Sequence, residues 1–259
     1  MRDEGQVTVS QEQEVATVWF DRPHARNAMT TAMYEQFTDA CIRPSVDRTL
    51  RLVVFRGVGG KSFVAGTDIA RFLSFTSGDD GVLYEREMEA HLQSLFAISV
   101  PTLAVIEGYA VGGGLNIAAA CDLRIAVHGA KFGTPIARTL GNCLAMPNYA
   151  RMLAGFGESR AKRMLLLGDL LSAREAQEAG FLARLVAPEA IEDTLAEVIA
   201  QVLANAPLTL EISKEAIRRI QAGDVPDGDD MIRRIYGSAD FRAGVAAFTG
   251  KAKPVWRGE

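Results

Sequence analysis

The chain has 259 residues, of which 48% are hydrophobic and 23% are charged. This composition is typical of a globular protein with a sizeable core, and it excludes a disordered chain. The formal net charge of −4 argues against a protein that binds nucleic acid through a basic surface, so no nucleic-acid partner is expected. A local cationic pocket for a small anionic ligand is compatible with that charge.

The cysteine and histidine content predicts neither disulfides nor a metal centre. The three cysteines are widely spaced without a CxxC pair, which indicates a reducing compartment, and the three histidines lie far apart in the sequence. The first residues lack the basic start and apolar run of a signal peptide. The most apolar stretch, 102–120, contains Glu107, Asn116 and four glycines, so it is expected in the core. We therefore expect a cytoplasmic protein without a membrane partner.

Strands alternate with helices through the first two thirds of the chain, which predicts an α/β fold. Alternating apolar residues predict strands, and apolar residues at helical spacing after a capping threonine predict a helix. In chain order we expect a hairpin over 7–20, a helix from 30 or 31, a strand over 50–55, a loop at 65–68, a helix over 83–97, a strand over 102–106 and a helix from the glycines at 112–114 to 120.

The last third of the chain is expected to be helical. Ser172 and Glu175 form the sequence of a capping box, for a short helix that ends at Gly180. Further helices are expected over 191–202, 208–221, 229–236 and 240–249. We place a boundary near residue 190, between an α/β core of residues 1–190 and a helical region of residues 191–259. The apolar faces of these helices exceed what one small bundle can bury, which suggests docking on a neighbouring subunit.

Two glycine-containing turns each follow a predicted strand: AGTDI at 65–69 and GYAVGGGLN at 108–116. The first N–H groups of a helix have no internal partner, and the helix dipole makes that end positive. Glycines at such an end let a ligand approach, so it can bind an anion or an oxygen that becomes negative during a reaction. Close packing of a strand against a helix explains the three successive glycines equally well. The spacings of a P-loop, a dinucleotide fingerprint and a GxSxG elbow are absent.

The order and spacing of several short motifs carry a family resemblance. The motifs are DRP at 21–23 with NAM at 27–29, AGTDI at 65–69, GYAVGGGLNIAAACDLRIA at 108–126, LLLGDLLSAREAQEAGFLARLV at 165–186 and AFTGK at 247–251. Through them the chain resembles the enoyl-CoA hydratase/isomerase (crotonase) superfamily nearly from end to end. The resemblance implies a crotonase-like spiral of repeated ββα units, a C-terminal helical trimerisation region, and a homotrimer or a hexamer built as a dimer of trimers. It also implies an acyl-CoA thioester as substrate, with no separate cofactor because coenzyme A is part of that substrate.

The resemblance also assigns roles to individual residues. The backbone N–H groups of Thr67 and Gly113 match the two donors of an oxyanion hole, which polarises the thioester carbonyl and stabilises an enolate. Phe248 and Lys251 match tail positions that reach the coenzyme A phosphates of a neighbouring subunit. Arg26 and Lys61 can equally be ordinary solvated charges. The residues expected to bind substrate or coenzyme A are His24, Ala25, Arg26, Lys61, Ala65, Gly66, Asp68, Ile69, Gly112, Phe248 and Lys251.

The chain departs from the family pattern at both acid/base positions. Hydratases of this family use two glutamates, and Asn116 and Ile136 stand at those positions here. An asparagine cannot take a proton at neutral pH, although it can orient a water or a carbonyl. The binding half of the mechanism is therefore expected, and ordinary two-glutamate hydration is not.

The segment 135–144 is unusual and contains Arg138 and Cys143. Arg138 can hold a carboxylate on the acyl group, or it can be a surface or subunit-contact residue. Cys143 is expected to be a small buried filler. A carboxylate from 79–89 can enter the site, but a solvated helix face is the expectation for that stretch. Asp68 and Asp122 are expected to cap helices or support the site, and His91 is expected in the core or on the surface.

The leading hypothesis is an acyl-CoA enzyme of the enoyl-CoA hydratase/isomerase family that stabilises a thioester enolate. A decarboxylase or isomerase that acts through Arg138 and bound water is an alternative within the enzyme class. A CoA-thioester binding protein that keeps the oxyanion hole but lacks the bases is an alternative outside it. RNA binding, which some relatives show, is disfavoured by the net charge.

Overall fold

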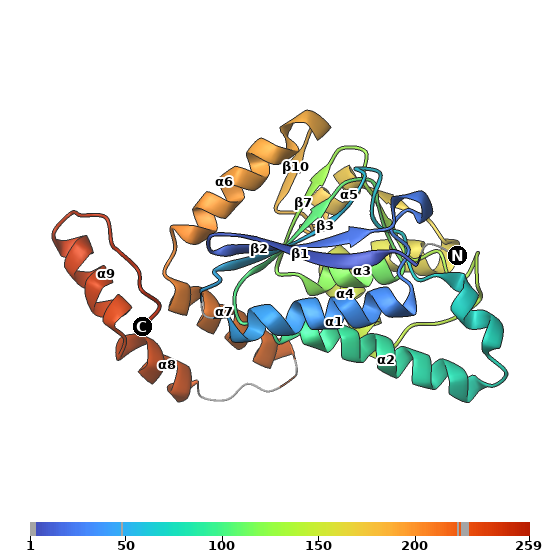
Figure 1. Cartoon of the computed structure of the whole chain (residues 1–259), viewed down its shortest axis with the longest axis horizontal. Helices are drawn as coiled ribbons and strands as arrows, with labels where there is room; N and C mark the ends of the chain where they lie inside the picture. The colour runs from blue at the N-terminus through green and yellow to red at the C-terminus, as the bar shows by residue number, and fades with distance from the viewer. Residues whose placement is uncertain (1–3, 48, 222, 224–227) are drawn as a thin grey trace.

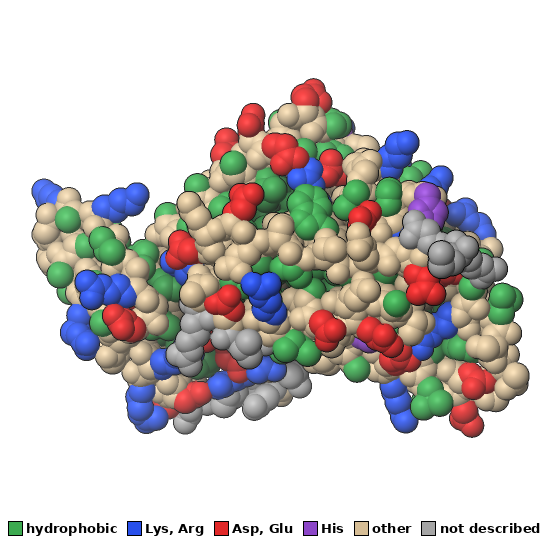
Figure 2. All heavy atoms as spheres, in the orientation of Figure 1, with side chains coloured by type: hydrophobic (Ala, Val, Ile, Leu, Met, Phe, Trp, Pro, Cys, Tyr) green, Lys and Arg blue, Asp and Glu red, His purple; other side chains and the backbone are tan. Residues whose placement is uncertain are grey.

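The computed structural model describes residues 4–47, 49–221, 223 and 228–259, without the side chains of residues 45, 46 and 248. Two sheets lie at the centre of the chain, with helices packed against them and a helical C-terminal region at one end (Figure 1). Acidic and basic side chains are interspersed over the face shown in Figure 2.

The larger sheet has six strands in the order β1-β2-β3-β5-β7-β10. β1 and β2 form the predicted hairpin, and β2, β3, β5, β7 and β10 run parallel to one another. Central strands such as VVF in β3 and LAVI in β5 are continuous apolar runs, as expected for parallel strands covered on both faces. The strands are β1 (Gln6–Glu12), β2 (Val15–Asp21), β3 (Leu52–Gly57), β5 (Thr102–Ile106), β7 (Leu123–Val127) and β10 (Arg184–Val186).

The smaller sheet has four short strands in the order β4-β6-β8-β9. They are β4 (Ser62–Val64), β6 (Tyr109–Val111), β8 (Lys131–Gly133) and β9 (Leu171–Ser172). The pairs β3–β4, β5–β6 and β7–β8 each place one strand in either sheet and are followed by α2 (Gly78–Phe96), α3 (Gly113–Ala120) and α4 (Met146–Lys162). This threefold ββα repeat confirms the predicted fold class.

Two helices differ from the sequence prediction. α2 begins at Gly78 and not near residue 83, because Ser77 and Asp80 form a capping box at its start. α4 was not predicted, since Pro147 at its start and the non-helical Gly157 inside it interrupt the helical pattern. α1 (Thr31–Val46) is confirmed, with the Thr30 hydroxyl accepting a hydrogen bond from the N–H of Met33.

The C-terminal third is mainly helical, as predicted, apart from β10. Its elements are η3 (Arg163–Leu167), α5 (Ala173–Glu178), η4 (Pro188–Ala190), α6 (Ile191–Leu203), α7 (Pro207–Gln221), α8 (Asp229–Tyr236) and α9 (Ala239–Thr249). Figure 1 shows α8 and α9 projecting away from the sheets. Among the described helices, none alone is long and apolar enough to cross a membrane; the helices over 188–203 and 207–221 satisfy length and composition only as a pair bent by 97°.

Polar contacts fasten the helical region to the sheets. Arg56 on β3 pairs with Glu107 at 2.7 Å and with Glu192 on α6 at 2.6 Å. Lys214 on α7 pairs with Asp122 at 2.8 Å, and the same carboxylate accepts hydrogen bonds from the backbone N–H and the hydroxyl of Thr102. Asp122 therefore fastens α7 to the start of β5, which differs from the expected role of capping a helix or supporting the site.

Candidate active site

The two glycine turns meet at one end of the smaller sheet. The turn 65–69 follows β4 and the turn 112–114 follows β6, and these two strands are parallel neighbours. Gly66 and Gly112 have φ of +99° and +56°, a region open to glycine. A Cβ built on Gly112 would lie 3.6 Å from the Cα of Gly66, so the two turns are in van der Waals contact.

Thr67 and Gly113 lie beside each other where the turns touch. A Cβ built on Gly113 would lie 3.5 Å from Thr67 Oγ1. The N–H of Met29 donates to the carbonyl of Gly66, and the N–H of Asp68 donates to the carbonyl of Met29, both at 2.8 Å. These bonds fix the chain on either side of Thr67. Among the described residues, no acceptor is found for the N–H of Thr67 or of Gly113, so both are available to an oxygen between them.

The three successive glycines have separate roles. Gly112 supplies the left-handed turn and the contact with Gly66. Gly113 is the first residue of α3, at the positive end of the helix dipole. Gly114 packs on β4, because a Cβ there would lie 2.7 Å from the carbonyl carbon of Val64. The ligand and packing interpretations of this motif are thus compatible.

A buried asparagine supports the first turn from behind. Asn27 is fully buried, and its amide nitrogen donates to the carbonyls of Val58 at 3.1 Å and Ser62 at 2.9 Å. Its amide oxygen accepts from the N–H of Arg22 at 2.9 Å. Arg22 also pairs with Asp68 at 2.8 Å. These contacts tie the NAM segment to β4 and to the turn that it precedes.

Asp68 caps a helix, as the sequence suggested. Its carboxylate accepts a hydrogen bond from the N–H of Ala70 at 3.0 Å, at the start of η2 (Ile69–Ser74). With Arg22 and the Ala70 N–H as partners, the carboxylate is committed to positioning the turn. Ile69 beside it is 63% exposed.

Most residues predicted to bind coenzyme A surround the first turn. His24 and Ala25 lie in η1 (Pro23–Ala25), and the carbonyl of Arg26 accepts a hydrogen bond from the N–H of Ala65 at 3.1 Å. The guanidinium of Arg26 is exposed and lies 5.1 Å from the centre of the Tyr109 ring. Lys61 is exposed immediately before β4. Two cationic side chains thus flank the strand that leads to Thr67.

The structure does not bring Phe248 and Lys251 to this site within one chain. The backbone of Phe248 lies in α9, its side chain is outside the described residues, and Lys251 is exposed just beyond the helix. Figure 1 places α9 apart from α3, at the far end of the long axis. Contact of these two residues with a neighbouring subunit's ligand stays a prediction.

Asn116 and Ile136, which the resemblance places at the acid/base positions of the family, supply no proton acceptor. Asn116 is only 8% exposed on α3, and its side-chain amide has no hydrogen-bond partner among the described residues. Ile136 is half-buried in the turn after β8. Arg138 is exposed in the same turn, and a Cβ on Gly168 would lie 3.2 Å from its Cβ. Within the described part of the chain, Arg138 forms no ion pair.

Cys143 corrects one expectation, because its thiol is exposed and not a buried filler. The loop 141–145 runs over the surface, where its backbone reaches solvent or polar side chains. The other two cysteines, Cys41 and Cys121, are buried, and burial raises the pKa of the Cys41 thiol to about 12.

The three glutamates of α2 do not form the solvated face that was expected for 79–89, although Asp79 is exposed as expected. Glu85 accepts a hydrogen bond from the N–H of Ala145 at 2.6 Å, Glu87 pairs with Arg71, and Glu89 pairs with Arg151 at 2.6 Å. Burial raises the pKa of Glu85, opposed by the Ala145 hydrogen bond. These carboxylates tie α2 to η2 and to the start of α4.

Three hydroxyl groups next to the glycine turns were missed by sequence reasoning. Tyr34 Oη lies 2.8 Å from Thr67 Oγ1, which lies 3.0 Å from Tyr84 Oη. Burial raises the pKa of both phenols, so both stay protonated at neutral pH. Phe72 packs edge-on against the Tyr84 ring, and Arg71 lies 5.2 Å from its centre. Tyr84 has the helical spacing of a core residue, which hid its polar contact.

His91 lies behind this hydroxyl cluster. Its ring stacks on Tyr34 with centres 5.3 Å apart, and Nδ1 lies 2.7 Å from Thr38 Oγ1. Burial lowers the pKa of His91, although Glu87 lies 3.7 Å from Nε2. His91 was expected in the core or on the surface and is half-buried, and Tyr34 stands between the imidazole and Thr67.

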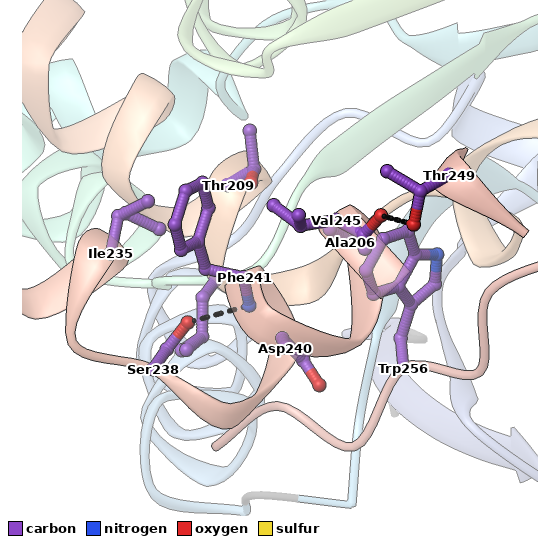
Figure 3. A pocket seen from close by; sticks show the side chains of 11 residues that line it. Ala206, Thr209, Ile235, Ser238, Asp240, Phe241, Val245, Thr249 and Trp256 are labelled. Atoms are coloured by element: carbon purple, nitrogen blue, oxygen red, sulfur yellow. Dashed lines mark hydrogen bonds between the residues drawn. The ribbon is translucent and has the colours of Figure 1, made fainter. Parts of the chain in front are cut away.

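A separate cavity of about 300 Å³ lies among α7, α8 and α9 (Figure 3). Its walls are mostly apolar and include Leu208, Ile235 and Trp256. Asp240 at its edge is buried and accepts hydrogen bonds from the N–H groups of Arg257 and Gly258. Among the described residues, no cluster of three or more His, Cys, Asp or Glu side chains is placed to hold a metal ion.

Paired sheets joined by ββα repeats place this chain in the crotonase fold class. The family model described as enoyl-CoA hydratase/isomerase matches residues 10–259. The crotonyl-CoA hydratase of Syntrophomonas wolfei is 29% identical, over 95% of this chain and 96% of that protein. The (E)-benzylidenesuccinyl-CoA hydratase of Thauera aromatica is 32% identical, over 97% of this chain and 99% of that protein. A crystal structure from Magnetospirillum magneticum, described as an enoyl-CoA hydratase/carnithine racemase, has a TM-score of 0.91 at 31% identity, over 98% of this chain and 96% of that one. The chain belongs to the enoyl-CoA hydratase/isomerase family.

Proposed function

We propose that this protein is an acyl-CoA enzyme that stabilises a thioester enolate between the N–H groups of Thr67 and Gly113. The observation that carries the proposal is the contact of the two glycine turns, which leaves both N–H groups without an acceptor among the described residues. Donors fixed in this way lower the energy of an oxygen on which charge develops, and losing one typically costs about 10²–10³ in rate. Family membership supports an acyl-CoA substrate.

The chemistry after enolate formation differs from two-glutamate hydration. Asn116 can orient water or the acyl carbonyl but cannot accept a proton, and Ile136 is apolar. The first test follows crotonyl-CoA by the ultraviolet absorbance of its conjugated thioester, with butyryl-CoA binding measured by calorimetry. Saturable turnover supports the enzyme, while tight binding without turnover of crotonyl-CoA or malonyl-CoA overturns catalysis and favours a binding protein.

A gain-of-function variant makes the test sharper. Asn116→Glu restores a carboxylate at the first acid/base position, so it should raise crotonyl-CoA hydration by about 10²-fold if the site is otherwise intact. Asn116→Gln is the matched control, since it has the same length without a proton acceptor. Equal rates in the two variants would contradict an intact oxyanion site.

A dicarboxylic acyl group is the second candidate substrate class, favoured by Arg138. Its exposed guanidinium forms no ion pair among the described residues and is available to a carboxylate. The Thauera relative is named for a benzylidenesuccinyl thioester, whose acyl group carries a second carboxyl. Arg138→Gln should raise KM for (E)-benzylidenesuccinyl-CoA about 10-fold or more and leave KM for crotonyl-CoA unchanged. Arg174→Gln, an exposed change on α5, is the control.

The same guanidinium serves the decarboxylase or isomerase alternative. With malonyl-CoA, Arg138 would hold the carboxylate, and bound water would assist proton transfer to the enolate. Decarboxylation is favoured over hydration if the wild type releases CO₂ from malonyl-CoA and Arg138→Gln does not. If Arg138→Gln keeps both hydration and decarboxylation, Arg138 is a surface residue without a role in either reaction.

We further propose that the helical region docks on neighbouring copies in a homotrimer or hexamer. Large apolar side chains stay exposed on α7, α8 and α9, namely Ile217, Ile220, Ile232, Tyr236 and Val245. Val245 also lines the cavity of Figure 3, and exposed apolar surfaces of this kind usually contact a partner. Sedimentation velocity should give three or six times the chain mass of 28.0 kDa, and a monomer at micromolar concentration would contradict the proposal.

A further inference from the structure

The Tyr34 side chain contacts both glycine turns of the candidate site, the first at 65–69 and the second at 112–114. Its hydroxyl lies 2.8 Å from Thr67 Oγ1 on the first turn. A Cβ built on Gly113, on the second turn, would lie 2.6 Å from the same hydroxyl oxygen. Since a carbon–carbon bond is about 1.5 Å long, this oxygen is at most about 4.1 Å from the Gly113 Cα, which is van der Waals contact. One phenol oxygen thus touches both residues whose N–H groups form the proposed oxyanion hole.

The backbone of Tyr34 has a fixed place relative to the first glycine turn. Tyr34 lies near the start of α1, and its N–H donates to the carbonyl of Thr30 at 3.0 Å. Just before this helix, Met29 forms a parallel bridge with Thr67. The helix therefore begins against the first turn, and the Tyr34 side chain reaches from there to the start of α3.

The Tyr34 ring is held in place on all sides. The residue is only 4% exposed, and its ring stacks on the imidazole of His91 with centres 5.3 Å apart. The Nδ1 atom of His91 lies 2.7 Å from the hydroxyl of Thr38, which is one helical turn further along α1. Side chains packed in this way keep a single rotamer, so the phenol oxygen stays between the two turns.

The Tyr34 hydroxyl donates its proton to Thr67. Among the described residues it has no other hydrogen-bond partner, and a buried hydroxyl proton without an acceptor is costly. Burial raises the pKa of this phenol, so the proton stays on it at neutral pH. The accepting oxygen is only two bonds away from the Thr67 Cα. The hydrogen bond therefore restricts the residue that supplies the first donor of the oxyanion hole.

We propose that Tyr34 is a positioning residue whose hydroxyl sets the distance between the N–H groups of Thr67 and Gly113. The assignment rests on the proposed oxyanion hole and names the side chain that fixes its width. Two donors stabilise a developing negative charge only when both reach the oxygen, and a misplacement of about 1 Å can cost about 10²-fold in rate. Without the hydroxyl, the nearest Tyr34 atom is 3.9 Å from a Cβ on Gly113, so the start of α3 loses this contact.

The first measurement is the infrared carbonyl stretch of butyryl-CoA labelled with ¹³C at the thioester carbon. Hydrogen bonds from both N–H groups weaken the C=O bond, so binding to the wild type should shift the stretch to lower frequency. In Tyr34→Phe this shift should be about half as large or smaller, while the dissociation constant changes less than about threefold. Turnover of crotonyl-CoA or malonyl-CoA should fall about 10-fold or more in kcat.

Tyr149→Phe is the matched control for these measurements. It also removes a partly buried phenol with one hydrogen bond, which accepts from the N–H of Leu144. It should keep the wild-type infrared shift and the wild-type kcat, because it leaves both glycine turns untouched. A general loss of packing would instead affect the two tyrosine variants alike.

A second pair of variants tests the spacing directly. Gly113→Ala places a methyl group 2.6 Å from the Tyr34 hydroxyl, so it should push the turns apart and lower kcat about 10²-fold. When Tyr34→Phe is added, the nearest ring atom is 3.9 Å from this methyl group, which is an ordinary contact. The double variant should therefore be about 10-fold more active than Gly113→Ala alone. Independent effects would make it about 10-fold less active.

The outcomes distinguish this assignment from the proposed function. A wild-type infrared shift that Tyr34→Phe leaves intact would overturn the role of Tyr34 alone, and so would a double variant less active than Gly113→Ala. If butyryl-CoA binds to the wild type without any shift, the oxyanion hole and the role of Tyr34 are both overturned. The infrared comparison needs only binding, so it decides the role of Tyr34 even if neither thioester is turned over.

Discussion

Gly114→Ala tests whether close packing of α3 on β4 holds the two glycine turns in register. A Cβ at this position would lie 2.7 Å from the carbonyl carbon and 2.8 Å from the Cβ of Val64. Carbon atoms in contact need about 3.5 Å, and the carbonyl oxygen of Val64 would lie nearer still, so helix and strand would have to separate by about 1 Å or more. The obstruction includes backbone, which cannot rotate away, and an overpacked buried site of this kind costs about 3 kcal/mol.

The same displacement acts on function, because Val64 precedes the turn with Thr67 and Gly114 follows Gly113. A misplacement of about 1 Å in a reacting geometry can cost about 10²-fold in rate. Denaturant unfolding followed by circular dichroism measures the stability, and crotonyl-CoA or malonyl-CoA turnover measures the function. Gly81→Ala is the matched control, since a Cβ there meets no atom within 4 Å inside α2.

The control should stabilise the protein by about 0.5–1 kcal/mol, because alanine restricts the unfolded chain and favours a helix. The packing argument is refuted if Gly114→Ala unfolds within 0.5 kcal/mol of the wild type. It is also refuted if the variant is destabilised as expected but keeps full turnover, since the register of the turns would then be set elsewhere.

Three further changes test contacts away from the reacting atoms. Asn27→Ala should lower the free energy of unfolding by about 3 kcal/mol, because three backbone groups lose buried hydrogen bonds; a loss below 1 kcal/mol in denaturant titrations would contradict this. Ser172→Ala should cost about 1 kcal/mol by removing the cap of α5, and Ser172→Thr should restore most of it. Hydrogen bonds led by the N–H of Ser172 hold the pKa of Glu175 at about 2, below its ordinary 4.5, so this stabilisation is complete above pH 4.5 and is lost as the pH falls towards 2. Thermal melts at pH 3 and 6 should show a smaller difference for Glu175→Gln than for the wild type.

Sequence patterns predicted the helices and strands that are determined by residues close to one another in the chain. The hairpin 7–20, the strand 102–106 and the capping box at Ser172 each depend on residues close in sequence, and each is confirmed. The three-residue strands of the smaller sheet were not predicted, because periodicity needs longer segments to be visible.

The residues of the candidate site also divide into those that local sequence signals predicted and those that only the fold brings together. The turns at 65–69 and 112–114 were found because glycine and helix-start signals are local. The contact of Tyr34 and Tyr84 with Thr67 joins segments 33 and 17 residues away, and neither tyrosine departs from the spacing of a core residue. The partners of Glu85 and Glu89 also lie about 60 residues away, so a solvated helix was the natural but incorrect expectation.

In the proposed enzyme, the ββα repeats separate the residues that bind the substrate from those that convert it. The first repeat supplies Thr67 and the second supplies Gly113, while the third contributes the turn with Ile136 and Arg138. Each of these turns follows its own short strand and precedes its own helix. The third turn can therefore change in sequence without disturbing the first two. In the proposed enzyme, Thr67 and Gly113 can therefore keep binding the thioester while the residues beside them, at 116 in the second repeat and at 136 in the third, change the reaction.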